Sequence, residues 1–79
     1  MKIKVLFFGA TAVITGQRRV EADVALGSKA SAIFEKLVTD HPSLAKHGLH
    51  FAVNQEYAIG DETLNDGDEL AIFTAVSGG

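Results

Sequence analysis

The sequence contains no cysteine and only one proline. Without thiols the chain can form neither a disulfide framework nor a thiolate metal site, and it has no cysteine nucleophile. It also lacks any apolar run near the ~20 residues that cross a bilayer, and no small-residue cleavage site follows its first residues. We therefore expect a cytoplasmic protein that is not processed at its start.

Positive charge is absent from the C-terminal third of the chain. All seven Lys and Arg residues lie between Lys2 and Lys46. The six acidic residues that follow are Glu56, Asp61, Glu62, Asp66, Asp68 and Glu69. The formal net charge of -3 argues against nucleic acid as a partner, since phosphate binding needs clustered basic side chains. We expect this third to form an acidic surface that steers the chain toward a basic partner.

The composition is that of an ordinary globular protein. Hydrophobic residues make up 47% of the chain and charged residues 22%, so a packed core is expected. A length of 79 residues allows one domain. We predict a single folded domain over residues 1–74 and a short flexible tail over residues 75–79.

Alternating apolar residues predict two strands in the first third of the chain. Apolar side chains stand at every second position over residues 3–7 and again over residues 20–26, which is the spacing of half-buried strands. Between them, residues 9–15 are followed by Gly16. This segment is compatible with one or two helical turns that a glycine closes. We expect the two strands to pair antiparallel.

The one long helical pattern covers residues 29–40. An apolar stripe with helical spacing runs along it, made of Ala30, Ile33, Phe34, Leu37 and Val38. Ser28 stands where its side chain can cap the first free amides, and Pro42 ends the pattern. The stripe must be buried, so we expect this helix to lie on the sheet.

Short extended patterns fill the rest of the chain. Residues 51–54 and 57–59 predict short strands around a polar turn. Residues 65–68 are typical of a turn in which Gly67 supplies a positive φ. Residues 70–74 predict a last strand. This order fits an α+β fold of the β-grasp type. In that fold a mixed sheet grips one main helix, and the last strand lies parallel beside the first.

The chain ends in Gly78 and Gly79 directly after the last apolar strand. Glycine has no Cβ, so such an end is thin and flexible enough to enter a narrow channel. Both properties suit a carboxylate that is presented to the active site of another protein. Glycine-rich termini are also common as inert, frayed ends, and the terminal residues alone do not separate these two interpretations.

Three stretches of the sequence resemble MoaD-type proteins, the small subunits of molybdopterin synthase. They are LNDGDELAIF over residues 64–73 with VSGG at residues 76–79, KVLFF over residues 4–8, and AVNQEY over residues 52–57. The resemblance covers essentially the whole chain and implies a ubiquitin-like β-grasp. One difference is Thr74-Ala75, where that family usually carries two prolines.

The resemblance implies that Gly79 is the working residue of a sulfur carrier in molybdenum-cofactor synthesis. An adenylating enzyme of the MoeB type would join its carboxylate to AMP, using ATP that the enzyme binds, and a sulfur donor would displace AMP to leave a thiocarboxylate. The tail would then enter the MoaE-type large subunit of a heterotetramer and pass its sulfur to a cyclic pterin precursor. Gly78 would provide clearance. The chain itself would bind no cofactor and catalyse no step alone.

Strand parity predicts a second apolar face on the sheet. If Ile3, Val5 and Phe7 face the helix, alternate residues of the first and last strands face away from it. These residues are Leu6, Phe8, Ala71 and Phe73, and the family resemblance adds Tyr57. Together with Asp66, Asp68, Glu69, Val76 and Ser77, they are our candidates for contact with a partner. The alternatives are that a loop covers this face or that the two faces are assigned the wrong way round.

Other candidate sites are weak. His41, His47 and His50 match no strong zinc spacing, the acidic turn around Gly67 lacks the ligand spacing of a calcium loop, and residues 9–11 lack the lysine of a phosphate loop. We therefore expect no metal site. Two rival functions stay open: a sulfur carrier of another pathway, such as thiamine synthesis, tRNA thiolation or protein conjugation, and a β-grasp interaction domain with an inert end.

Overall fold

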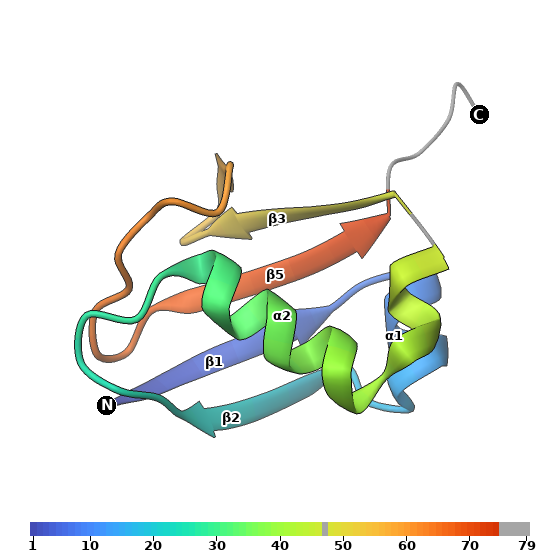
Figure 1. Ribbon diagram of the computed structural model, residues 1–79, viewed down its shortest axis with the longest axis horizontal. Helices are drawn as coiled ribbons and strands as arrows, with labels where there is room; N and C mark the ends of the chain where they lie inside the picture. Colours follow the sequence, from blue (N-terminus) through green and yellow to red (C-terminus); the bar gives the residue numbers. More distant parts are fainter. Residues whose placement is uncertain (47, 75–79) are drawn as a thin grey trace.

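The computed structural model describes residues 1–46 and 48–74 (Figure 1). Its elements are β1 (Lys2–Phe7), α1 (Ala10–Thr15), β2 (Arg19–Asp23), α2 (Ala30–Asp40), the 3-10 helix η1 (Pro42–Lys46), β3 (Leu49–Val53), β4 (Glu56–Ala58) and β5 (Glu69–Thr74). His47 and the tail residues Val76, Ser77, Gly78 and Gly79 lie outside the described residues, so their predicted roles stay predictions. In the described part of the chain, no helix is long and apolar enough to cross a membrane.

The five strands form one mixed sheet in the order β2-β1-β5-β3-β4. The first and last strands of the chain lie side by side at its centre and run parallel, whereas all other neighbours are antiparallel. Helix α2 crosses one face of this sheet (Figure 1). The predicted α+β class and β-grasp arrangement are confirmed.

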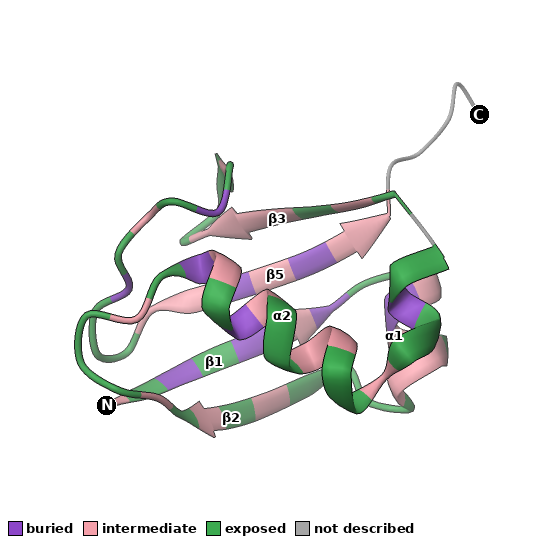
Figure 2. Cartoon of the chain, in the orientation of Figure 1, coloured by how far each residue is buried: buried purple, intermediate pink, exposed green. Residues whose placement is uncertain are grey.

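The core lies between α2 and the two central strands. Ile3, Val5 and Phe7 of β1 are almost fully buried, as are Leu70 and Ile72 of β5. They pack with buried residues of the helix, Ala30 and Ile33, and with Leu64. Figure 2 shows the alternation of buried and less buried residues along these strands. The parity predicted from the sequence is therefore correct, and it fixes which side chains face away from α2.

Strand β2 is shorter than predicted. It ends at Asp23, and Leu26, which we expected to continue the alternation, is 84% exposed. The cause is a turn directly after the strand, in which the Ala25 carbonyl accepts both the backbone N–H and the hydroxyl of Ser28. This turn carries the chain away from the sheet toward α2.

Ser28 does not cap α2, which corrects our expectation. Its hydroxyl is used in the turn, and Lys29 is the N-cap residue, with no side-chain cap bond. The first free amides of the helix instead donate to backbone carbonyls of the loop before β5: the Ala30 N–H to Glu62 and the Ser31 N–H to Gly60. Backbone groups far away in sequence therefore satisfy this helix end, and no local pattern could reveal them.

Two buried leucines lie outside every predicted element. Leu44 in η1 is fully buried, and Leu64 in the loop before β5 is 1% exposed. Each stands alone in a polar stretch, so neither belongs to a periodic pattern that the sequence analysis could detect. Helix α1, by contrast, ends as predicted at Gly16, which has a positive φ of 71°.

Candidate functional site

The sheet face turned away from α2, which we call the open face, carries a continuous apolar row. Leu6 of β1 stands opposite Ala71 of β5, Ala71 opposite Ala52 of β3, and Ala52 opposite Tyr57 of β4. Directly opposite residues have their side chains on the same side of a sheet. One apolar row therefore crosses four strands.

Aromatic rings extend this row toward the end of β5. Phe73 lies with its ring centroid 5.9 Å from that of His50 and 5.7 Å from that of Tyr57. Tyr57 is 82% exposed and Phe8 is 52% exposed. Exposed, clustered aromatic side chains are typical anchors of protein interfaces.

The structure brings together the apolar candidates predicted from parity and resemblance, namely Leu6, Phe8, Ala71, Phe73 and Tyr57. Their role in binding stays a prediction. Sequence reasoning missed His50 and Ala52 as members of the same face. The pairing of β3 with β5 is what places them there, and that pairing leaves no local signal in the sequence.

The acidic candidates Asp66 and Asp68 have a structural role in the fold, and their predicted contact with a partner stays a prediction. Asp66 accepts the backbone N–H of Lys2 at 2.8 Å, and Asp68 accepts the backbone N–H of Asn65 at 2.7 Å and the side-chain amide of Asn54 at 3.0 Å. These carboxylates close the turn before β5. They therefore lie at the opposite end of this strand from Phe73, roughly 17 Å away for a strand of this length.

Glu69 lies on the open face, but not within the apolar row. It stands opposite Lys4 in the β1–β5 ladder, two residues from the Leu6 and Ala71 pair. On the other side of Lys4 stands Glu21 of β2. Charged residues therefore border the apolar row on the side of the turn.

Glu62 is fixed by backbone amides of its own loop. Its carboxylate accepts the N–H groups of Ile59 at 2.9 Å and Gly60 at 2.8 Å. The hydrogen bond from Ile59 is the main cause that holds the pKa of Glu62 below its ordinary value. A carboxyl group with a lowered pKa is a poor general acid, so this residue is structural.

Thr11 joins the ends of the two central strands. Its hydroxyl oxygen lies 2.7 Å from the Phe8 carbonyl oxygen and 2.9 Å from the Ile72 carbonyl oxygen, and it accepts the Phe8 N–H at 2.9 Å. This threonine is fully buried. It therefore holds β5 at Ile72 to the residue that follows β1.

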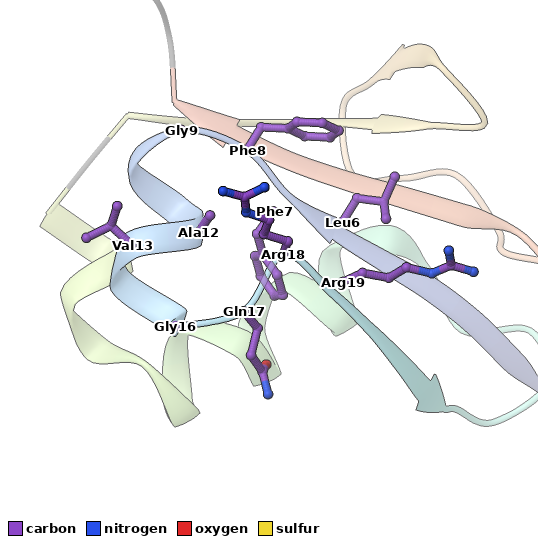
Figure 3. A pocket seen from close by; sticks show the side chains of 10 residues that line it. All are labelled: Leu6, Phe7, Phe8, Gly9, Ala12, Val13, Gly16, Gln17, Arg18 and Arg19. Carbon is purple, nitrogen blue, oxygen red and sulfur yellow. The ribbon is translucent and has the colours of Figure 1, made fainter.

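A groove of about 770 Å³ opens beside this point, between α1, the end of β1 and the start of β2. Its lining includes Leu6 and Phe8, so it continues the open face, and it also includes Arg18 and Arg19. Figure 3 shows the guanidinium group of Arg18 turned toward Phe8, whereas Gln17 points away from it. The sequence analysis did not identify these arginines, because nothing in the sequence places them beside Phe8.

No group of three or more potential metal ligands occurs within residues 1–46 and 48–74. The described residues offer an apolar and aromatic surface near the end of β5 that leads into the tail.

Comparison with known proteins identifies the family. A profile of the ThiS family matches residues 5–79. A human protein named molybdopterin synthase sulfur carrier subunit is 39% identical over 83 residues, which cover 99% of this chain and 94% of that protein.

Solved structures confirm the fold. SAMP1 from Haloferax volcanii, a small archaeal modifier protein, is 29% identical with a TM-score of 0.85 and full coverage of both chains. A chain in the complex of subunits 1 and 2 of molybdopterin-converting factor from Helicobacter pylori aligns with a TM-score of 0.70 at 21% identity, again over the full length of both. Since the profile and the human relative both cover nearly all of its length, this chain belongs to the ThiS family of ubiquitin-like β-grasp proteins.

Proposed function

We propose that this chain is the sulfur carrier subunit of a molybdopterin synthase, with the carboxylate of Gly79 as the sulfur acceptor. One observation supports this proposal most: Phe73, near the end of β5 that continues into a Gly-Gly tail, lies beside the exposed ring of Tyr57. The full-length similarity to relatives named as this subunit supports it independently.

In the proposed chemistry the carboxylate is activated before it receives sulfur. A carboxylate oxygen of Gly79 attacks the α-phosphate of ATP on an adenylating enzyme, and pyrophosphate leaves. The acyl adenylate then reacts with a sulfur donor, so that a C–S bond forms and AMP departs. The product is a thiocarboxylate whose sulfur passes to a cyclic pterin precursor on the large subunit.

The described residues contribute position rather than catalysis. Strand β5 pairs with β1 on one side and β3 on the other. The Thr11 hydroxyl also bonds the carbonyl oxygen of Ile72 in this strand. Five residues follow Thr74, and an extended chain spans at most ~3.6 Å per residue. The carboxylate can therefore reach at most roughly 18 Å from the sheet, so a partner has to dock close to this end.

The open face is our proposed docking surface for the large subunit. Its apolar row and aromatic rings provide the anchors, and the groove beside Arg18 extends the contact area. We also propose that an adenylating enzyme of the MoeB type binds the chain before the synthase does, and that the synthase is a heterotetramer.

Intact mass spectrometry tests the proposal. After incubation with ATP, an adenylating partner and a sulfur donor, the chain should gain the mass difference of sulfur replacing oxygen. A chain extended by one residue after Gly79 is the matched control, and it should lose sulfur loading completely while its free energy of unfolding stays within ~0.5 kcal/mol. Normal loading of the extended chain, without trimming, would remove Gly79 from this role.

A second candidate function is attachment to other proteins. The likeness to an archaeal modifier protein favours it, since that structure matches this chain over its full length. In the same incubation with added lysine-bearing protein, a modifier would form an isopeptide bond and lose one water. A sulfur carrier would form only the thiocarboxylate.

A further inference from the structure

Strand β2 leaves one edge of the sheet free. It is the first strand in the sheet order, and among the described residues only β1 pairs with it. The other edge strand, β4, has three residues, whereas β2 has five. Figure 1 shows β2 along the margin of the sheet. A free edge is a template on which another strand can pair.

The register shows which backbone groups point outward. Met1 and Val24 exchange both of their backbone hydrogen bonds, and the Phe7 N–H donates to the Arg18 carbonyl. Antiparallel pairs alternate between bonded and non-bonded positions. The N–H and C=O groups of Arg19, Glu21 and Asp23 therefore point away from β1, to the free edge.

A groove runs along the same edge on the side of α2, with a volume of about 400 Å³. Its apolar lining includes Val20 and Ala22 of β2, Val24 directly after that strand, and Ile33 and Leu37 of α2, and the charged residues Lys36 and Asp40 of α2 also line it. Val20 and Ala22 alternate with the β2 residues that present free backbone groups. A strand added at this edge would therefore place every second side chain in the groove.

The charges of β2 determine the chemistry of the added strand. Arg19, Glu21 and Asp23 are exposed on the open face, and the only ion pair among the described residues joins Lys29 and Asp61. Opposite charges at directly facing positions stabilise a ladder, and like charges destabilise it. A strand that fits has basic residues facing Asp23 and Glu21, and an acidic residue facing Arg19.

We propose that the free edge of β2 and its groove form a second docking site, which binds an extended segment of a partner protein by antiparallel strand addition. Read from its N-terminus, the segment has the pattern basic, apolar, basic, apolar, acidic. This site is separate from the tail and lies across β1 from the row of Ala71 and Ala52. A test of this site therefore does not depend on the proposed function.

A short peptide provides the direct test. We would titrate acetyl-Thr-Lys-Val-Lys-Val-Glu-Thr-amide into the full chain and follow backbone amides by NMR. The amide signals of Arg19, Glu21 and Asp23 should shift and exchange more slowly with solvent, whereas those of Ala71 and Phe73 should stay unchanged. Shifts confined to β5 and β3, or no binding up to millimolar peptide, would overturn the proposal.

Backbone methylation distinguishes strand addition from simple charge attraction. Methyl groups on the nitrogens of the two lysines and the glutamate remove the donors that face β2, so binding should weaken at least about tenfold. Methyl groups on the two valine nitrogens point to solvent and should leave binding nearly unchanged. Equal effects of both peptides would exclude a hydrogen-bonded ladder.

A charge exchange tests the register. Glu21→Arg should weaken binding about threefold to tenfold, and a peptide with glutamate in place of its second lysine should restore it. Glu35→Arg on the exposed side of α2 makes the same change in net charge and should have no effect. Failure of the exchanged peptide to restore binding would contradict the register. Sedimentation is a separate check: dimers that form through β2 would assign the edge to a second copy of this chain instead.

Discussion

The two ends of strand β5 satisfy their polar groups in different ways. At the turn end, side chains close the structure: Asp66 and Asp68 accept backbone amides, and Asn54 binds both Asp68 and the Glu69 N–H. Toward the tail end, Thr11 supplies a side-chain bond, and the rings of Phe8 and Tyr57 remain exposed. The turn end therefore serves stability, and we expect the tail end to serve binding.

The largest expected effect that would separate the two ends concerns the exposed aromatic residues. Phe8→Ala or Phe73→Ala should weaken binding to the large subunit by about 1 to 3 kcal/mol, the range for an interface anchor. Leu26→Ala, which removes an apolar side chain that is 84% exposed and lies outside the open face, should leave binding unchanged. Titration calorimetry and thermal unfolding give the two quantities. A loss of stability of ~3 to 5 kcal/mol with normal binding would show that the rings belong to the core.

At the turn end we expect substitution to lower stability more than binding. Asp68→Ala leaves the Asn65 N–H and the Asn54 side chain without their acceptor, which should lower the free energy of unfolding by about 1 to 3 kcal/mol. The folded fraction should dissociate from the large subunit at the normal rate. Asp61→Ala is the control, because it removes an exposed ion pair that contributes at most ~1 kcal/mol. Faster dissociation of a stable Asp68 variant would place the turn in the interface.

A smaller effect is expected on the rate of association. Replacing Asp66, Asp68 and Glu69 by Asn and Gln should slow association with a basic partner about twofold to tenfold at low salt and flatten its salt dependence. Stopped-flow fluorescence at several ionic strengths measures both. Since Asp66 and Asp68 also hold the turn, Glu69→Gln alone is the cleaner variant. An unchanged rate at low salt would remove electrostatic steering.

The smallest expected effect concerns Glu62 and pH. Its pKa in the folded state lies below the ordinary value of 4.5 because amide N–H groups, that of Ile59 first, bind the ionised form. The resulting stabilisation is present above pH ~4.5 and is lost as the pH falls through the lower folded pKa. Glu62→Gln should therefore reduce the dependence of stability on acid pH in urea unfolding. The same slope of unfolding free energy against pH in both proteins would contradict a lowered pKa of Glu62.

Periodic patterns were sufficient to predict the sheet faces and the helix. Ile3, Val5 and Phe7 alternate with residues of the opposite face, so burial and exposure on β1 follow from parity alone. The same reasoning placed Ala71 and Phe73 on the open face. These predictions succeeded because side-chain direction in a strand depends only on local geometry.

Features that depend on distant pairing could not be predicted. The helix cap supplied by Glu62 and Gly60 carbonyls, the buried Leu44, and the position of His50 beside Phe73 all require the assembled fold. The structural role of the acidic turn could not be predicted for the same reason. The Asp66 carboxylate accepts an amide at the start of β1, far away in sequence, and its predicted contact with a partner stays a prediction.

The central position of β5 also has a mechanical consequence. A partner that pulls on the tail applies force along the strand axis, parallel to β1 and antiparallel to β3. The hydrogen bonds of both ladders run across that axis, so they are loaded together in shear instead of opening one after another. Resistance to forced unfolding depends on the unfolding barrier. Both ladders therefore share a force applied along β5 before the domain opens.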